Sequence, residues 1–300
     1  MENSPGKGKF NQILKLEAAI PLLFTYALGI SLVHYLGGDL DIVNLILGCL
    51  MCLLIYEMPN FLNAYFDHPE SYQSTLNVND PYREFLLGTK RPLLLQYSLL
   101  ILTAGAMISV VLIARKALTG PGILLLGIAW LMYLFAASPP LRLGKSGYEE
   151  LIEALFIANL VPSIAFALQG KELSFLLVEL TLPLTLIYLA MKIAFLIKEY
   201  GFDSMHGRQS LVIRMGWQKA VVLHNLLILA SFLLVGIFAL LGLPWSLTWP
   251  ILLALPVGGL QVLQMQRISE GEKPKWTLLR WLAMGLFLLM VYFEVISLWL

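Results

Sequence analysis

The chain has 300 residues, of which 59% are hydrophobic and only 13% are charged. Soluble domains carry about a quarter charged residues, so this composition excludes an ordinary soluble protein. The net charge of +1 gives no basis for nucleic-acid binding. Apolar runs of about 20 residues, the length that crosses a bilayer as a helix, recur along the whole chain. The sequence therefore predicts an all-α, polytopic membrane protein.

The apolar runs predict nine transmembrane helices in a single membrane domain covering residues 1–300, with the helical bundle starting at about residue 17. Their expected bounds are about 17–36, 42–66, 93–114, 121–138, 150–169, 173–199, 217–241, 247–265 and 276–299. Four prolines, Pro21, Pro162, Pro183 and Pro256, fall inside these spans, which membrane helices tolerate when neighbours satisfy the freed carbonyls. Two connections, 67–92 and 199–216, are expected to be motif-bearing loops.

Basic residues gather at one set of helix ends. These ends carry Lys7, Lys9, Lys15, Arg83, Lys90, Arg91, Arg142, Lys145, Lys198, Arg208, Arg214, Lys219, Arg267, Lys273, Lys275 and Arg280. The opposite ends have only Arg115, Lys116 and Lys171, beside Asp39 and Asp41. Because loops rich in Lys and Arg stay in the cytoplasm, we expect the basic ends and the N-terminus to be cytoplasmic. In a bacterium the membrane would be the inner membrane of the cell.

A first polar group closes the second span. Asn60, Asn63 and Asp67 are spaced three and four residues apart, which places them on one face of a helix. Two amides and a carboxylate at the mouth of a membrane helix are costly unless they face a cavity, a partner or an ion. The loop that follows contributes Glu70, Asp80, Glu84, Thr89, Lys90, Arg91, Pro92 and Leu93.

A second polar group follows the sixth span at the same predicted side. Glu199 and Asp203 are one helical turn apart, with Lys198 and Arg208 nearby. Two facing clusters of oxygen ligands suit Mg²⁺, which takes few carboxylates and shares its other positions with water and phosphate oxygens. The neighbouring cations, Arg91, Arg142, Lys145, Lys198 and Arg208, are suited to binding phosphate oxygens.

Each of these residues also has an ordinary structural explanation. A carboxylate near a helix end can be a cap or a solvated group, two asparagines can hydrogen-bond neighbouring helices, and cations at these ends set topology. Cys49 and Cys52 are interpreted as packing residues, and His68 and His206 as loop residues. His34 is expected near the extracytoplasmic end and His224 inside the seventh span. Physical reasoning alone therefore predicts a membrane protein with a magnesium–phosphate site on its cytoplasmic side.

A third stretch carries a family resemblance. Tyr133 is followed by Ser138-Pro139-Pro140-Leu141-Arg142 and then Lys145. This stretch resembles the Tyr…Ser-Pro-Pro-x-Arg-x-x-Lys segment of the UbiA superfamily of intramembrane prenyltransferases. Asn60, Asn63 and Asp67, with Thr89, Arg91, Pro92 and Leu93, are similar to the first family motif and its Thr-x-Arg-Pro-Leu extension. Glu199, Asp203, Gly207, Arg208, Ser210 and Leu211 are similar to the second.

The resemblance implies a nine-helix bundle and a magnesium-dependent transfer of a polyprenyl group from its diphosphate to an aromatic or other lipophilic acceptor. By this resemblance Asn63, Asp67, Glu199 and Asp203 hold Mg²⁺. The diphosphate is bound by Asn60, Arg91, Arg142, Lys145, Lys198 and Arg208. Asp67, Asp203 and Tyr133 are the candidate catalytic residues, with Tyr65 and Phe66 as further aromatic faces for an allylic cation. Membrane lipids are expected partners, and no protein partner is indicated.

The first motif departs from the family pattern. Ala64 stands where the family has its first Asp, Ser71 where it has its last, and Glu199 replaces the leading Asp of the second motif. Glu70, Asp80 or Glu84 is a possible substitute ligand. These changes keep three alternatives to transfer open: a UbiA-type terpene cyclase, in which the tail captures its own cation; a non-catalytic isoprenoid-binding protein; and a transporter, which the absence of a convincing internal repeat disfavours.

Overall fold

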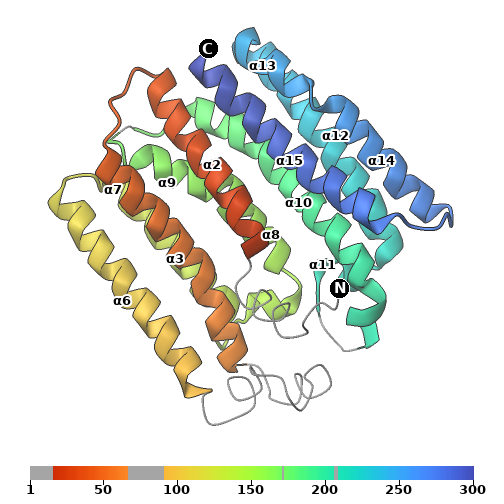
Figure 1. Cartoon of the computed structure of the whole chain (residues 1–300), viewed down its shortest axis with the longest axis horizontal. Coiled ribbons are helices and arrows are strands. Elements are labelled where there is room, and N and C mark those ends of the chain that lie inside the picture. The colour runs from red at the N-terminus through yellow and green to blue at the C-terminus, as the bar shows by residue number, and fades with distance from the viewer. Residues whose placement is uncertain (1–15, 67–90, 171, 206–208) are drawn as a thin grey trace, which may run out of the picture.

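The computed structural model describes residues 16–66, 91–170, 172–205 and 209–300. Within these ranges the chain is helical and contains no strand. The helices lie side by side in one bundle, with connections at its two ends (Figure 1).

The long helices follow the apolar runs of the sequence. They are α2 (Leu16–Tyr35), α3 (Ile42–Phe66), α6 (Pro92–Ala114), α7 (Gly120–Ala137), α8 (Glu149–Leu155) continued by η2 (Phe156–Leu160) and α9 (Val161–Ala167), α10 (Phe175–Met205), α12 (Trp217–Leu241), α13 (Trp245–Leu252) followed by α14 (Leu255–Ser269), and α15 (Trp276–Trp299). Two short helices, η1 (Leu143–Ser146) and α11 (Leu211–Met215), lie in connections.

Eight spans in the described residues are long and apolar enough to cross a membrane, with α8–η2–α9 and α13–α14 each counting as one. The apolar part of α2, Ala19–Tyr35, adds a shorter ninth. The all-α membrane architecture predicted from the sequence is therefore confirmed, and the bounds of α3, α12 and α15 coincide with the expected spans.

The α10 helix is longer than expected. The sequence predicted a loop from residue 199, but the helix continues to Met205. A helical backbone satisfies its own hydrogen bonds, so it does not have to end where the apolar run ends. Glu199 and Asp203 consequently lie on successive turns of a helix.

Two spans form the centre of the bundle. In Glu149–Ala167 and Phe175–Gly201 the buried shares of the apolar window are 83% and 78%, against 28% for α6. The outer helices instead present large apolar side chains, such as Met107 and Leu240, on the surface. Polar residues on the two central spans therefore face protein or internal space, where a membrane protein can use them.

The first central span contains a π-helical turn, η2, between Glu153 and Pro162. Its Asn159 Nδ2 donates to Thr181 Oγ1 of α10 at 3.0 Å. Further along, α9 packs closely on α2, because a Cβ placed on Gly29 would lie 2.2 Å from the Pro162 carbonyl oxygen. A π turn in a membrane-spanning helix is frequently found at a functional site.

At the end of the bundle predicted to be extracytoplasmic, a polar cluster connects residues from several helix ends. Arg115 pairs with Asp41 at 2.8 Å and donates to Asn44 Oδ1 at 2.8 Å. Gln169 accepts from the Asp41 backbone N–H at 2.9 Å. The backbone N–H of Asn44, followed by the Arg115 side chain, lowers the pKa of the Asp41 carboxyl. Partly exposed pairs of this kind stabilise a fold by about 0–1 kcal/mol.

Candidate active site

The last two turns of α3 present polar side chains to a cavity. Tyr56, Asn60 and Asn63 all line it, as their spacing of four and three residues allows. The Asn60 amide also donates to Glu57 Oε2 at 3.0 Å. The asparagines of the first predicted motif therefore face a cavity, as the sequence suggested.

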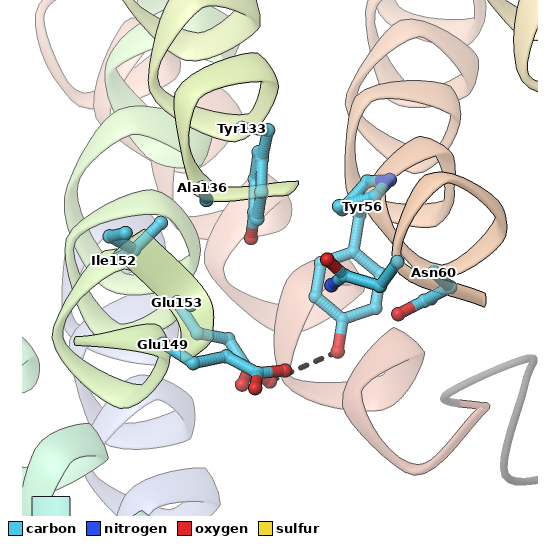
Figure 2. Close-up of a pocket in the computed structure, with 10 residues that line it drawn as sticks. Tyr56, Asn60, Tyr133, Ala136, Glu149, Ile152 and Glu153 are labelled. Atoms are coloured by element: carbon cyan, nitrogen blue, oxygen red, sulfur yellow. Dashed lines mark hydrogen bonds between the residues drawn. The ribbon is translucent and has the colours of Figure 1, made fainter. Parts of the chain in front are cut away.

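The cavity lies between α3, α7, α8 and η1 and is small, with a volume of about 20 Å³ open to the centres of water-sized molecules. Its walls are Tyr56, Pro59, Asn60, Asn63, Tyr133, Ala136, Gly144, Glu149, Ile152 and Glu153. Figure 2 shows the Tyr133 hydroxyl and the Glu149 and Glu153 carboxylates directed toward the same space as Tyr56 and Asn60. Aromatic, amide and carboxylate groups thus meet at one end of the bundle.

Glu153 is the hub of a buried polar network. Its Oε1 accepts from the Tyr56 hydroxyl at 3.0 Å, the bond drawn in Figure 2, and from the Tyr188 hydroxyl at 2.9 Å. Its Oε2 pairs with Lys192 Nζ at 2.8 Å. A buried carboxylate needs such compensation to remain charged, and here one oxygen accepts two hydrogen bonds while the other pairs with a cation.

Tyr133 is the aromatic centre of the cavity wall. Its ring meets Phe156 edge-to-face with centroids 4.8 Å apart and Tyr56 at 6.4 Å. The ring is buried, and its hydroxyl has no hydrogen-bond partner in the described part of the chain. A buried hydroxyl without a partner is free to bind a substrate group or a water molecule.

Two predicted arginines gather at the end of α3. Arg91 donates to the Tyr65 carbonyl at 2.6 Å, with its guanidinium 5.9 Å from the centre of that ring. Arg142 lies 6.0 Å from the Phe66 ring and has a left-handed backbone, with φ of 41°. Tyr65 and Phe66 thus pack against cations of the protein, and their role as faces for a substrate cation stays a prediction.

The residues of the second motif differ in exposure. Lys198 and Glu199 are exposed, whereas Asp203 is 2% exposed. Lys145 lies in η1. Asp67 and Arg208 are outside the described residues, as are Glu70, Asp80, Glu84, Thr89, His68, His206 and Gly207.

The donor set fits a hard divalent cation. Asn63, Glu199 and Asp203 offer amide and carboxylate oxygens, the ligand atoms that Mg²⁺ prefers. No group of three or more His, Cys, Asp or Glu residues that could hold a metal occurs among the described residues. The fourth predicted ligand, Asp67, lies one residue beyond the described end of α3.

Sequence reasoning missed the α8 wall and its partners. Glu153 lies within a predicted span and Glu149 just before it, Tyr56, Tyr188 and Lys192 lie within two others, and none of them was singled out. One signal was available, since charged residues inside a predicted membrane span are by default functional candidates. Glu149 and Glu153 are four residues apart, and Lys192 lies well inside its span.

Comparison with known proteins identifies the fold and the family. The family model described as the UbiA prenyltransferase family matches residues 22–288. A UbiA homologue from Archaeoglobus fulgidus, solved with GPP and Mg²⁺, is 15% identical with a TM-score of 0.63, over 97% of this chain and 100% of its own. The same homologue with DMAPP and Mg²⁺ gives 15% and 0.64, over 97% and 99%.

A third structure, from work on digeranylgeranylglyceryl phosphate synthase, is 18% identical with a TM-score of 0.60, over 94% of this chain and 91% of its own. Curated proteins gave no match. At identities this low, the matched structures show the fold alone. The family model matches most of the sequence and shows the family. The chain is an integral, multi-pass membrane protein and belongs to the UbiA prenyltransferase family.

Proposed function

We propose that this protein is a magnesium-dependent intramembrane prenyltransferase, which moves a polyprenyl group from its diphosphate to an aromatic or other lipophilic acceptor. The observation that carries the proposal is the cavity where Asn60 and Asn63 of α3 face Tyr133 of α7 in a UbiA fold. The structural neighbours bound to GPP or DMAPP together with Mg²⁺ support the choice of donor and metal.

The residues divide into a charged mouth and an apolar interior. Asn63, Asp67, Glu199 and Asp203 would hold Mg²⁺, which when bound neutralises diphosphate charge and makes it a better leaving group. Arg91 and Arg142 lie at the end of α3, in the right region to bind diphosphate oxygens. Asn60, Lys145, Lys198 and Arg208 complete the proposed diphosphate-binding set.

The apolar interior would take the prenyl tail. When the carbon–oxygen bond of the donor breaks, its electron pair leaves with the diphosphate and positive charge develops on the allylic carbon. The Tyr133 ring in the cavity wall stabilises that charge through its π face. The acceptor then supplies an electron pair to the allylic carbon and releases a proton.

The distribution of basic residues supports a cytoplasmic position for this site. Arg91, Arg142, Lys198 and Arg280 all lie at the end of the bundle that carries the cavity, whereas Arg115 and Lys116 lie at the other. A cytoplasmic mouth would receive donor directly from the compartment where soluble diphosphates are made.

The test is turnover by purified protein in lipid nanodiscs, supplied with Mg²⁺, prenyl diphosphates of several lengths and a panel of lipophilic acceptors. We expect pyrophosphate release that EDTA abolishes and that Mg²⁺ restores, together with a prenylated acceptor in the organic phase by mass spectrometry. A cyclised hydrocarbon formed without acceptor would show that the enzyme is a cyclase and not a transferase. Tight isoprenoid binding without any pyrophosphate release would overturn the enzyme assignment.

A further inference from the structure

We propose that Glu153 and Lys192 form a buried charged pair that holds a fixed negative pole at the inner end of the cavity, where it positions Tyr56 and Tyr188 and stabilises the allylic cation. The proposal rests on the proposed function and deepens it. It assigns a role to a carboxylate outside both acidic motifs.

The residues of this network lie on the same faces of α3 and α10 as the residues of the two motifs, but deeper in the bundle. On α3, Tyr56, Asn60 and Asn63 follow one another at intervals of four and three residues, within about 60° of one helix face. On α10, Tyr188, Lys192, Glu199 and Asp203 fall within a similar arc. The partners of Glu153 are therefore the inner members of the two faces whose outer members are the proposed metal ligands.

Glu153 bridges these two helices. It accepts from Tyr56 of α3 and from Tyr188 of α10, while its second oxygen pairs with Lys192. A carboxylate bonded to both helices fixes their separation directly beneath the proposed diphosphate site. Glu153 is thus placed to act on the geometry of both motifs.

The cavity extends from Asn63, near the end of α3, to this network. Asn63 and Glu153 both line it, and Tyr56 lies about 10 Å along the α3 axis from Asn63. The first carbons of a prenyl tail enter this interval when the diphosphate is held at the mouth. In this binding mode the carbon that becomes positively charged would lie between Asn63 and Glu153.

The pair directs its negative end at that carbon. Glu153 lines the cavity, whereas Lys192 does not, so the net-neutral pair is an oriented dipole. Fixed dipoles aimed at developing charge need no reorganisation during the reaction and are strong in a water-poor site. Donation of the Tyr56 hydroxyl to a carboxylate also enriches the Tyr56 ring, and an electron-rich ring binds a cation better.

A stabilising role in folding does not explain the charges. Withdrawing an ion pair from water carries a desolvation penalty, and apolar residues of similar volume are often equally or more stabilising. The retained charge is instead accounted for by the reaction. The step itself leaves Glu153 unchanged: the carbon–oxygen bond breaks with its electrons on diphosphate, the acceptor forms the new bond, and the acceptor proton leaves with diphosphate or solvent.

The test compares geranyl diphosphate with 2-fluorogeranyl diphosphate, whose fluorine destabilises the allylic cation. For Glu153→Gln we expect kcat to fall at least about tenfold, the lower end of losing a positioned electrostatic contact. The donor KM should stay within about threefold, because the diphosphate anchors are untouched. The ratio of the two donors' rates should rise severalfold, because the variant depends more on the intrinsic stability of the cation.

Further variants separate this role from a structural one. Lys192→Arg keeps the charge and should retain most activity, whereas Tyr56→Phe should show a smaller rise in the fluorine ratio than Glu153→Gln. The control is Glu294→Gln on α15, which replaces a buried carboxyl that does not line the cavity. It should leave kcat and the fluorine ratio unchanged.

The outcomes distinguish the two proposals. No turnover by the wild type with any donor overturns the proposed function, and this inference with it. If the wild type turns over and Glu153→Gln has the same ratio of rates with the two donors, only the role of Glu153 is overturned. Any loss of activity in that variant would then be structural. If Glu153→Gln fails to fold, Tyr56→Phe decides on the same ratio.

Discussion

The Tyr133 hydroxyl is a polar group buried among apolar neighbours in the wall of the cavity. A buried hydroxyl without a hydrogen bond costs about 1–3 kcal/mol, which folding has to offset elsewhere. No acceptor for it occurs in the described part of the chain. The group therefore fits a contact that forms only when substrate fills the cavity.

Replacing Tyr133 by Phe tests that interpretation. The variant removes the hydroxyl and keeps the ring, so we expect a thermal midpoint equal to or above that of the wild type. We expect kcat to fall about tenfold or more, the scale of one lost transition-state contact. Unfolding in detergent and initial-rate kinetics measure the two. A lower midpoint would mean that the hydroxyl is already bonded within the fold.

The acidic motifs support a second residue-level prediction. Asp67→Asn and Asp203→Asn should each lower activity at least about a hundredfold, because each removes a charge proposed to act on the diphosphate site. Asp39→Asn is the matched control, since Asp39 is exposed at the other end of the bundle. Near-wild-type rates in both motif variants would refute the metal assignment.

At this scale the sequence predicted only part of the site. Asn60, Asn63 and Tyr133 were recognisable because their spacing places them at the mouth of a helix or in a family motif. Glu153 was not, because its partners Tyr56 and Tyr188 are separated from it by 97 and 35 residues. Only the packing of three helices brings these side chains together, and helix packing cannot be read from local spacing.

Among the described glycines, Gly29 on α2 makes the closest approach to another helix, at α9. Membrane helices approach closely where small residues let backbones meet, and Gly29 packs on the Pro162 carbonyl in this way. Pro162 in turn lies just after the π turn. The position of α9 against α2 therefore helps to fix the helix that carries Glu149 and Glu153.

Substitution of Gly29 by Ala should destabilise the bundle. A Cβ would lie 2.2 Å from a backbone oxygen, so a helix has to move, and overpacking of this kind costs about 1–3 kcal/mol. Gly285→Ala on α15 meets nothing within 4 Å and should be neutral or slightly stabilising. Thermal unfolding in the same detergent compares the two. Equal midpoints would contradict the close packing.

Helix bounds were the most predictable feature of the molecule. A span has to cover the hydrocarbon core of the bilayer, so the apolar runs define α3, α12 and α15 to the residue. The end of α10 was not predictable in the same way, because outside the hydrocarbon core both helix and loop satisfy the backbone. The difference moves Asp203 from an expected loop to a helical turn.

For the whole molecule, charge distribution predicts one orientation in the membrane. Single cysteines introduced at Glu272 and at Asp39 report on opposite ends of the bundle, since both residues are exposed and lie in connections. The native Cys49 and Cys52 lie within α3, so they are first replaced by Ala. We expect an impermeant thiol reagent outside the cell to label the Asp39 site and spare the Glu272 site. The reverse pattern would place the cavity outside.

The π turn also affects the direction in which Glu149 and Glu153 point. Each residue of an α-helix turns the chain by about 100°, and a π turn accommodates one additional residue. If the same residues adopted regular α geometry, the extra residue would no longer be absorbed, and Glu149 and Glu153 would rotate by about that angle relative to Pro162. The two carboxylates would then point away from Tyr56 although no cavity residue had changed. Relatives that share this wall of the cavity should therefore have either the π turn or a regular α-helix with one residue fewer between Glu153 and Pro162.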